Sequence, residues 1–144
     1  MSGRFVLAFA AAAVIGVSAL ASVAAQAAQA PQLDYDFFKS RVLPIFAKKR
    51  DGHSPCVVCH TGANNFLRLE ELAPGQTAWN DEQSRKMFDS ISRLVSPANR
   101  PQSRLLIHPL APEAGGDLFH SGGRQFESKD DPDYQVLMQW AGAK

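Results

Sequence analysis

The sequence predicts a small all-α domain. Three segments combine apolar residues at helical spacing with recognisable end signals, and no segment alternates apolar and polar residues as a half-buried strand would. The chain has 144 residues, which is the size of one domain. We therefore expect three to four helices in one domain, with a long loop before the last helix.

The first thirty residues differ from the rest of the chain. Arg4 is their only charged residue, and the apolar run Phe5–Leu20 is followed by small residues with two A-x-A-like sites, at 25–27 and 28–30. This pattern predicts a secretory signal peptide over 1–30. An uncleaved membrane anchor is the alternative, although the run is shorter than the ~20 residues of a spanning helix. Residues 31–144 are then one exported domain, periplasmic or extracellular, with membrane association left open.

The exported part is electrically balanced. Because Arg4 is the one charge before residue 31, the remainder keeps fourteen of the fifteen basic residues and all fourteen acidic residues. No basic excess indicates nucleic acid as a partner. The only cysteines, Cys56 and Cys59, could form a disulfide in an oxidising compartment. Such a bond would close a very small loop and constrain the unfolded chain little, so it explains the pair poorly.

Residues 34–49 form the first expected helix. Its apolar side chains recur at steps of three and four, which places them on one face: Phe38, Val42, Ile45 and Phe46. Aspartates near its start and basic residues at its end complement the helix dipole. Pro44 interrupts the segment, so we expect a kink or two short pieces.

A second clear helix is expected over Asn80–Val95. Asn80 and Gln83 have the spacing of a capping box. The apolar residues that follow form one stripe: Met87, Phe88, Ile91, Leu94 and Val95. Between the cysteines and this helix the signals are few, and only a short helix at Leu69–Ala73 is expected.

The last third of the chain combines a long loop with a well-marked helix. Ser103–Ile107 is expected to form a single turn. Residues 108–130 contain two prolines and four glycines, which resist regular structure, and a loop of this length in a small domain suggests a function. Asp131 as cap and Pro132 at the first helical position begin the final helix. Its buried side should hold Tyr134, Leu137, Met138 and Trp140.

The pentapeptide CVVCH at 56–60 has the attachment pattern of c-type haem. In this chemistry each thiol adds across one haem vinyl group and forms a thioether. Cysteines three residues apart on a helical turn reach two neighbouring vinyls, and the histidine that follows projects toward the iron as its proximal ligand. We expect one haem c, with its iron, bound through Cys56, Cys59 and His60.

Two other uses of the cysteines compete with haem attachment. A thioredoxin-like redox pair needs a βαβ context, and no strands are expected. A zinc site usually needs four ligands. His53, Cys56, Cys59 and His60 could supply them, but they lack the usual separation into two ligand pairs. Haem is therefore favoured over both.

The order of these segments resembles a class I-type cytochrome c domain, over Asp34–Ala143. More narrowly, the chain is similar to small monohaem domains of secreted planctomycete and acidobacterial proteins. The resemblance is carried by VLPIFAKK, CVVCH, FLRLEEL, HSGGRQF and DYQVLMQW. The haem motif is specific, whereas the other segments support the resemblance mainly by their order along the chain. The resemblance implies a class I-like fold around one haem, with a ligand-bearing loop before the last helix.

The second axial ligand is where the sequence departs from ordinary class I cytochromes. Those commonly place a methionine in the loop before the final helix, and this loop has none. Met87 and Met138 lie in expected helices and are assigned to the core. We choose His120, because the glycines after it let the backbone come close to a flat porphyrin. His108 is the alternative, and a five-coordinate iron is also left open.

Several other residues are candidates for contacts with the haem. Arg68, Arg104 and Arg124 flank segments expected near it, and a guanidinium matches the geometry of a propionate, although a solvated role is favoured for each. Trp79 and Trp140 could pack on the macrocycle or bond its propionates, with core packing an equal alternative.

These expectations favour electron transfer over catalysis. An iron held on both faces has no free position for substrate, so gain and loss of one electron remain. We expect a carrier or relay subunit and not an enzyme, acting with redox partner proteins, either free or within a larger membrane-associated or multihaem complex. Two histidine ligands should lower the reduction potential relative to histidine and methionine. The alternative is a gas sensor or peroxidase-like protein with an open coordination site.

Two charge clusters are candidates for partner docking. Opposed patches would give the domain a dipole that orients encounters, although helix ends attract such charges in any case. The basic cluster is Lys39, Arg41, Lys48, Lys49 and Arg50, and the acidic cluster is Glu127, Asp130, Asp131 and Asp133.

Overall fold

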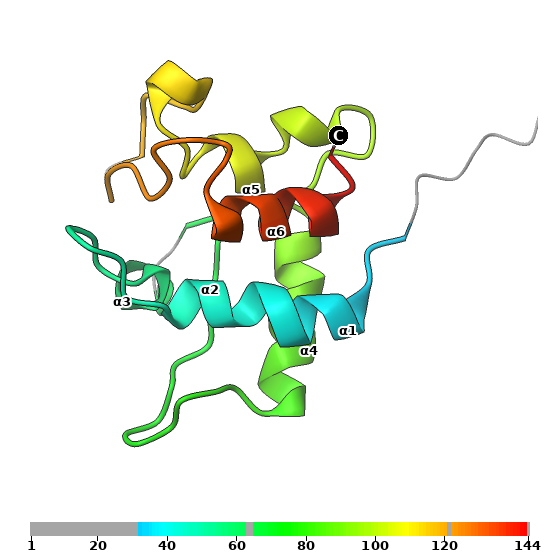
Figure 1. Ribbon diagram of the computed structural model, residues 1–144. Helices are drawn as coiled ribbons and strands as arrows, with labels where there is room; N and C mark the ends of the chain where they lie inside the picture. The colour runs from blue at the N-terminus through cyan, green and yellow to red at the C-terminus, as the bar shows by residue number, and fades with distance from the viewer. Residues whose placement is uncertain (1–31, 63–64, 121, 144) are drawn as a thin grey trace, which may run out of the picture.

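The computed structural model describes residues 32–62, 65–120 and 122–143, so the expected signal peptide at 1–30 lies outside the described residues. The described part is a small all-helical domain in which no strand forms (Figure 1), as predicted. None of its helices is long and apolar enough to cross a membrane. The elements are α1 (Tyr35–Phe37), η1 (Phe38–Val42), α2 (Leu43–Ala47), α3 (Cys56–His60), α4 (Asp81–Ser92), η2 (Arg100–Gln102), α5 (Arg104–Ile107), η3 (Pro112–Ala114) and α6 (Pro132–Ala141).

The first helical run is continuous from α1 through α2 and changes type in the middle. The side chain of Asp34 caps it by accepting from the Phe37 N–H over 2.9 Å. In the π-helical turn η1, the Leu43 N–H donates to the carbonyl of Phe38, five residues back. Proline has no N–H, and its ring crowds the preceding turn. The wider turn before Pro44 accommodates that ring, so the segment forms one contiguous helical run and not two separate pieces.

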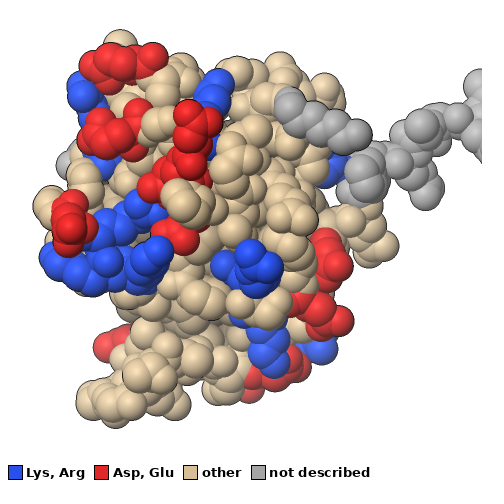
Figure 2. Space-filling view, in the orientation of Figure 1, with Lys and Arg blue, Asp and Glu red and all other residues tan. Residues whose placement is uncertain are grey.

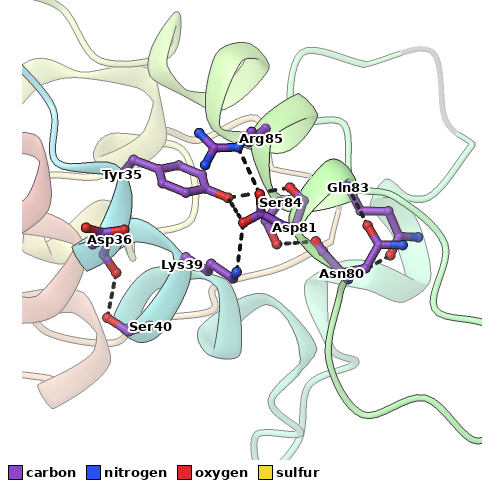
Figure 3. Close-up of polar contacts among 9 residues, drawn as sticks. All are labelled: Tyr35, Asp36, Lys39, Ser40, Asn80, Asp81, Gln83, Ser84 and Arg85. Atoms are coloured by element: carbon purple, nitrogen blue, oxygen red, sulfur yellow. Dashed lines mark hydrogen bonds and ion pairs between the residues drawn. The ribbon is translucent and has the colours of Figure 1, made fainter.

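The predicted helix over residues 80–95 is confirmed, with an earlier end at Ser92. Asn80 accepts from the Gln83 N–H over 2.9 Å, and the Gln83 side chain accepts from the Asn80 N–H over 3.0 Å (Figure 3). This reciprocal pair is the expected capping box. Met87 and Ile91 are buried, so the predicted apolar stripe faces the core.

Figure 3 also shows how the start of α4 is tied to the first helical run. The carboxylate of Asp81 accepts from the Tyr35 hydroxyl and pairs with Lys39, both at 2.8 Å, and with Arg85 at 2.9 Å. These hydrogen bonds lower the pKa of Asp81. The cluster is exposed, so it fixes orientation more than it adds stability.

The prediction of a short helix at Leu69–Ala73 is wrong, because this segment is not helical. Its backbone groups bond to distant parts of the chain. The Leu69 N–H donates to the carbonyl of His60 over 3.2 Å, and the Trp79 indole N–H donates to the carbonyl of Glu70 over 2.7 Å. These bonds tie the segment to the end of α3 and to the approach of α4, and a local helix would use the same groups internally.

The core forms where the first run, α4 and α6 meet. Figure 1 shows α6 alongside the first run, with α4 crossing behind. Phe38 packs against Trp140 at 5.0 Å and against Phe88 at 5.4 Å between ring centroids. The Trp140 indole N–H donates to the carbonyl of Asp34 over 2.8 Å. The indole N–H groups of both tryptophans therefore donate to backbone carbonyls of the domain.

The two charge clusters are not fully opposed, because two residues of each meet. Arg50 binds Asp131 through two hydrogen bonds of 2.9 Å and also pairs with Asp133 at 2.6 Å. Lys48 pairs with Asp133 as well, at 2.8 Å. Figure 2 shows Lys and Arg side chains mixed with Asp and Glu on this face. Asp131 is also the N-cap of α6, so its carboxylate stabilises the start of that helix.

The long loop folds back on itself between α5 and α6. The Ala111 N–H donates to the carbonyl of Phe126 over 2.8 Å, and the Phe126 N–H donates to the carbonyl of Pro109 over 3.1 Å. The Asp117 N–H returns to the carbonyl of Ile107 over 2.8 Å. These bonds fix both ends of the loop, and with them the positions of its two histidines.

Candidate haem-binding site

An apolar cavity lies between α2, α3, α5, α6 and the long loop. It contains ≈ 680 Å³ of space, its open mouth included. Its apolar wall includes Ile45, Phe46, Leu105, Phe126 and Leu137. A second, more open cleft shares Cys56, His60, Asn65, His108, His120 and Gln125 with it. The cavity and the cleft therefore adjoin each other, and together they are here called the opening.

Helix α3 presents both cysteines to this opening. Cys56 is half-buried and lines the cavity, whereas Cys59 is exposed and lines the adjoining cleft. Both are free thiols, and burial raises the pKa of Cys56. A single helical turn therefore offers two thiols along one edge of the opening.

The backbone holds the imidazole of His60 in one tautomer. Its Nδ1 lies 2.8 Å from the carbonyl oxygen of Leu67 and 3.1 Å from Oδ1 of Asn65. Carbonyl oxygens only accept, so Nδ1 carries the hydrogen and Nε2 keeps its lone pair. Metal-bound histidines are commonly oriented by such a bond from the nitrogen that does not bind the metal.

His120 has the same arrangement on the long loop. Its Nδ1 donates to the carbonyl of Gly123 over 2.6 Å, which leaves Nε2 unprotonated. Burial lowers the pKa of His120, which favours the neutral ring. A neutral imidazole is the form that binds a metal.

The rings of His60 and His120 form a pair within the opening. Their centroids are 6.3 Å apart, and their planes differ by 19°. Two metal–imidazole bonds of about 2 Å each, plus about 1 Å from each nitrogen to its ring centroid, give a separation of ~6 Å. The spacing therefore fits two imidazoles that bind one metal from opposite sides.

His108 lines the same cavity but is oriented by a carboxylate. Its Nδ1 donates to Asp117 over 2.9 Å, and this bond lowers the pKa of Asp117. Its ring lies 4.8 Å from that of His120, at 58°. This pair is too close to share a metal in the way that the His60–His120 spacing allows.

The two methionines that the structure describes, and His53, do not line the opening. Met87 is 1% exposed in the core, and Met138 packs against the core from the last helix. Neither lines the cavity or the cleft, and neither does His53. The assignment of both methionines to the core is therefore confirmed.

One of the three candidate arginines reaches the opening. Arg104 lines the cavity. Arg124 instead pairs with Glu113 at 3.0 Å, and Arg68 lies outside both linings. Trp79 and Trp140 are also absent from the linings. Core packing therefore describes both tryptophans.

The described residues give no support to the competing uses of the cysteines. No group of three or more His, Cys, Asp or Glu among them is arranged to hold a metal ion, so the zinc alternative has no site. The described part also lacks the strands of a βαβ unit.

Comparison with known proteins leaves the site to be judged by its geometry. No family model, curated protein or solved structure matches the chain.

Proposed function

We propose that this chain is a monohaem c-type cytochrome domain with a class I-like fold that transfers electrons outside the cytoplasm. Haem c is attached through Cys56 and Cys59, and its iron is bound by His60 and His120. When bound, the haem supplies one-electron oxidation and reduction at its iron. The observation that carries the proposal is the spacing of the two imidazoles, 6.3 Å between centroids at 19°.

The surroundings of the two histidines support this proposal. The apolar wall of the cavity suits the macrocycle. The cysteines lie along one edge of the opening, where thioether bonds to the vinyl groups would form. The backbone carbonyls of Leu67 and Gly123 hold the two rings in the tautomer that binds a metal. Preorganised ligands of this kind reduce the rearrangement that accompanies a change of charge at the metal.

The proposed ligation limits the chemistry. With imidazoles on both sides, no position is open for a substrate, so the domain acts as a carrier or relay and not as an enzyme. Two histidines favour a lower potential than histidine and methionine. Its partners are redox proteins, met either freely or within a larger complex.

The competing function is a haem protein with an open site, such as a gas sensor or a peroxidase-like enzyme. Carbon monoxide added to the reduced holoprotein separates the two, because it binds only where a position is free. We expect wild type and His108→Ala to resist carbon monoxide and His120→Ala to bind it at once. Immediate binding by wild type would favour the open site, and binding by His108→Ala alone would make His108 the ligand.

A further inference from the structure

An arginine and a phenylalanine form a pair at the mouth of the cavity, here called the rim pair. The guanidinium carbon of Arg104 lies 4.2 Å from the centroid of the Phe66 ring. Both side chains line the cavity and both are exposed, Phe66 to 68%. A large apolar ring this exposed at the mouth of a cavity suggests that a bound group covers it.

The charge of Arg104 is not neutralised by an ion pair. Arg50, Arg85 and Arg124 each pair with a carboxylate. No such pair involves Arg104 among the residues that the structure describes. Asp117 influences it electrostatically, but the Asp117 carboxylate already accepts from His108 and from the Phe119 N–H. The guanidinium is therefore able to accept an anionic partner.

The backbone holds Arg104 firmly at this position. Leu105 and Leu106, the next residues of α5, are 4% and 0% exposed. The helix is thus anchored in the core, and the arginine projects at the edge where the cavity opens. The face of Phe66 fixes the plane of the guanidinium through a cation–π contact. A cation held in this way has lost part of its freedom before any ligand binds.

We propose that the rim pair binds a carboxylate of the haem, namely a propionate. The inference depends on the proposed function, because it assumes a haem in the cavity. A guanidinium binds a carboxylate through two parallel hydrogen bonds, and the propionates are the anionic groups on an otherwise apolar macrocycle. A cation at the open mouth, with apolar walls deeper in, matches that distribution of charge. Arg104 thus sets which edge of the haem faces solvent.

The first test compares haemin with haemin dimethyl ester, in which the propionates are blocked. The chain carries Cys56→Ala and Cys59→Ala, so that both porphyrins bind without covalent attachment. We expect Arg104→Ala to weaken haemin binding at least tenfold, which is about 1.4 kcal/mol, and to leave binding of the ester unchanged. Arg104→Lys should be intermediate. Arg93→Ala is the control, because Arg93 is exposed and does not line the cavity. Equal losses for both porphyrins, or no loss for haemin, would overturn the proposal.

The second test uses the matured holoprotein and does not need the cysteine-free chain to fold. A cation near the haem favours the reduced state, so Arg104→Ala should lower the reduction potential. Phe66→Ala removes no charge, yet it should lower the potential too, because Phe66 positions the guanidinium. The double variant should then match Arg104→Ala alone. Additive shifts of the reduction potential in the double variant, or no shift in Phe66→Ala, would overturn the proposed role of the rim pair. A wild type that carries no haem would instead overturn the proposed function.

Discussion

A Cβ atom on Gly122 would lie 3.3 Å from Cε1 of the His120 ring and 3.4 Å from its Nε2. Gly122 therefore leaves room for the imidazole at the side that we propose binds iron. Gly123 has φ +80°, a left-handed conformation that favours glycine, and its carbonyl accepts from Nδ1 of the same ring. The two glycines after His120 thus have different effects on one side chain.

Gly122→Ala should weaken the bond between His120 and the iron without unfolding the domain. Its φ is outside the left-handed region, so alanine is compatible with the backbone and the added methyl presses on the ring. The reduced variant should bind carbon monoxide in part, and its oxidised spectrum should show some high-spin iron. The double variant with His120→Ala should behave as His120→Ala does. A Gly122→Ala spectrum identical to wild type would contradict a role for His120 as ligand.

Gly123→Ala should affect both stability and ligation, and Gly75→Ala is its matched control. The two glycines have nearly the same φ, +80° and +82°, and an added Cβ meets nothing within 4 Å at either site. Each alanine should cost about 1–2 kcal/mol because of left-handed strain. Only Gly123→Ala should also change the haem spectrum, since it alone shifts a carbonyl that orients His120. Chemical denaturation and visible spectra of the two variants measure this difference.

Met87→Ala should destabilise the domain without changing the ligands of the iron. Met87 is 1% exposed, and truncating a buried methionine typically costs about 2–5 kcal/mol. Met87→Leu, a swap of similar volume, should cost less than about 1.5 kcal/mol. Urea denaturation gives the free energies, and the spectrum is recorded where each variant is folded. Loss of low-spin iron in folded Met87→Ala would indicate a methionine ligand instead of His120.

The free energy of unfolding should fall in acid, partly through Asp131. The hydrogen bonds from Arg50 lower the pKa of this carboxyl in the folded state, whereas the unfolded value is about 3.9. The stabilisation is thus complete above the unfolded value and is lost as the pH falls through the lower folded value. Asp131→Asn keeps a good N-cap residue but loses the ion pair. It should be less stable than wild type at pH 7 and closer to it near pH 3, as measured by denaturation. Asp130→Asn is the control, because Asp130 is exposed and, among the described residues, its carboxylate accepts only a long 3.4 Å hydrogen bond from Ser128. Equal losses at both pH values would contradict the role of the Arg50 pair.

Local signals in the sequence predicted the parts of the fold that depend on neighbouring residues. The Asn80 capping box and the start of α6 at Pro132 are of this kind, because their hydrogen bonds join residues two or three apart. The non-helical segment at Leu69 was missed because its bonds reach His60 and Trp79. The meeting of the two charge clusters was missed for the same reason, since Arg50 and Asp131 are far apart in the chain.

The candidate site likewise has a part that the sequence predicted and a part that it did not. The spacing of the motif predicted that Cys56, Cys59 and His60 share one helical turn, because residues three and four apart lie on one turn wherever the segment is helical. The groups that orient the histidines carried no usable signal. The Leu67 and Gly123 carbonyls are backbone atoms, and Asp117 is one acid among fourteen in the sequence. Only the folded chain brings these groups to the rings.

The mass of the intact mature protein, exported by cells that contain the c-type haem maturation machinery and measured after denaturation, tests the central claim most directly. Thioether bonds survive denaturation, so we expect the polypeptide to carry the mass of one haem. Variants without both cysteines should lose that mass. A wild-type protein that has the mass of the polypeptide alone would contradict haem attachment, and with it the proposed electron transfer.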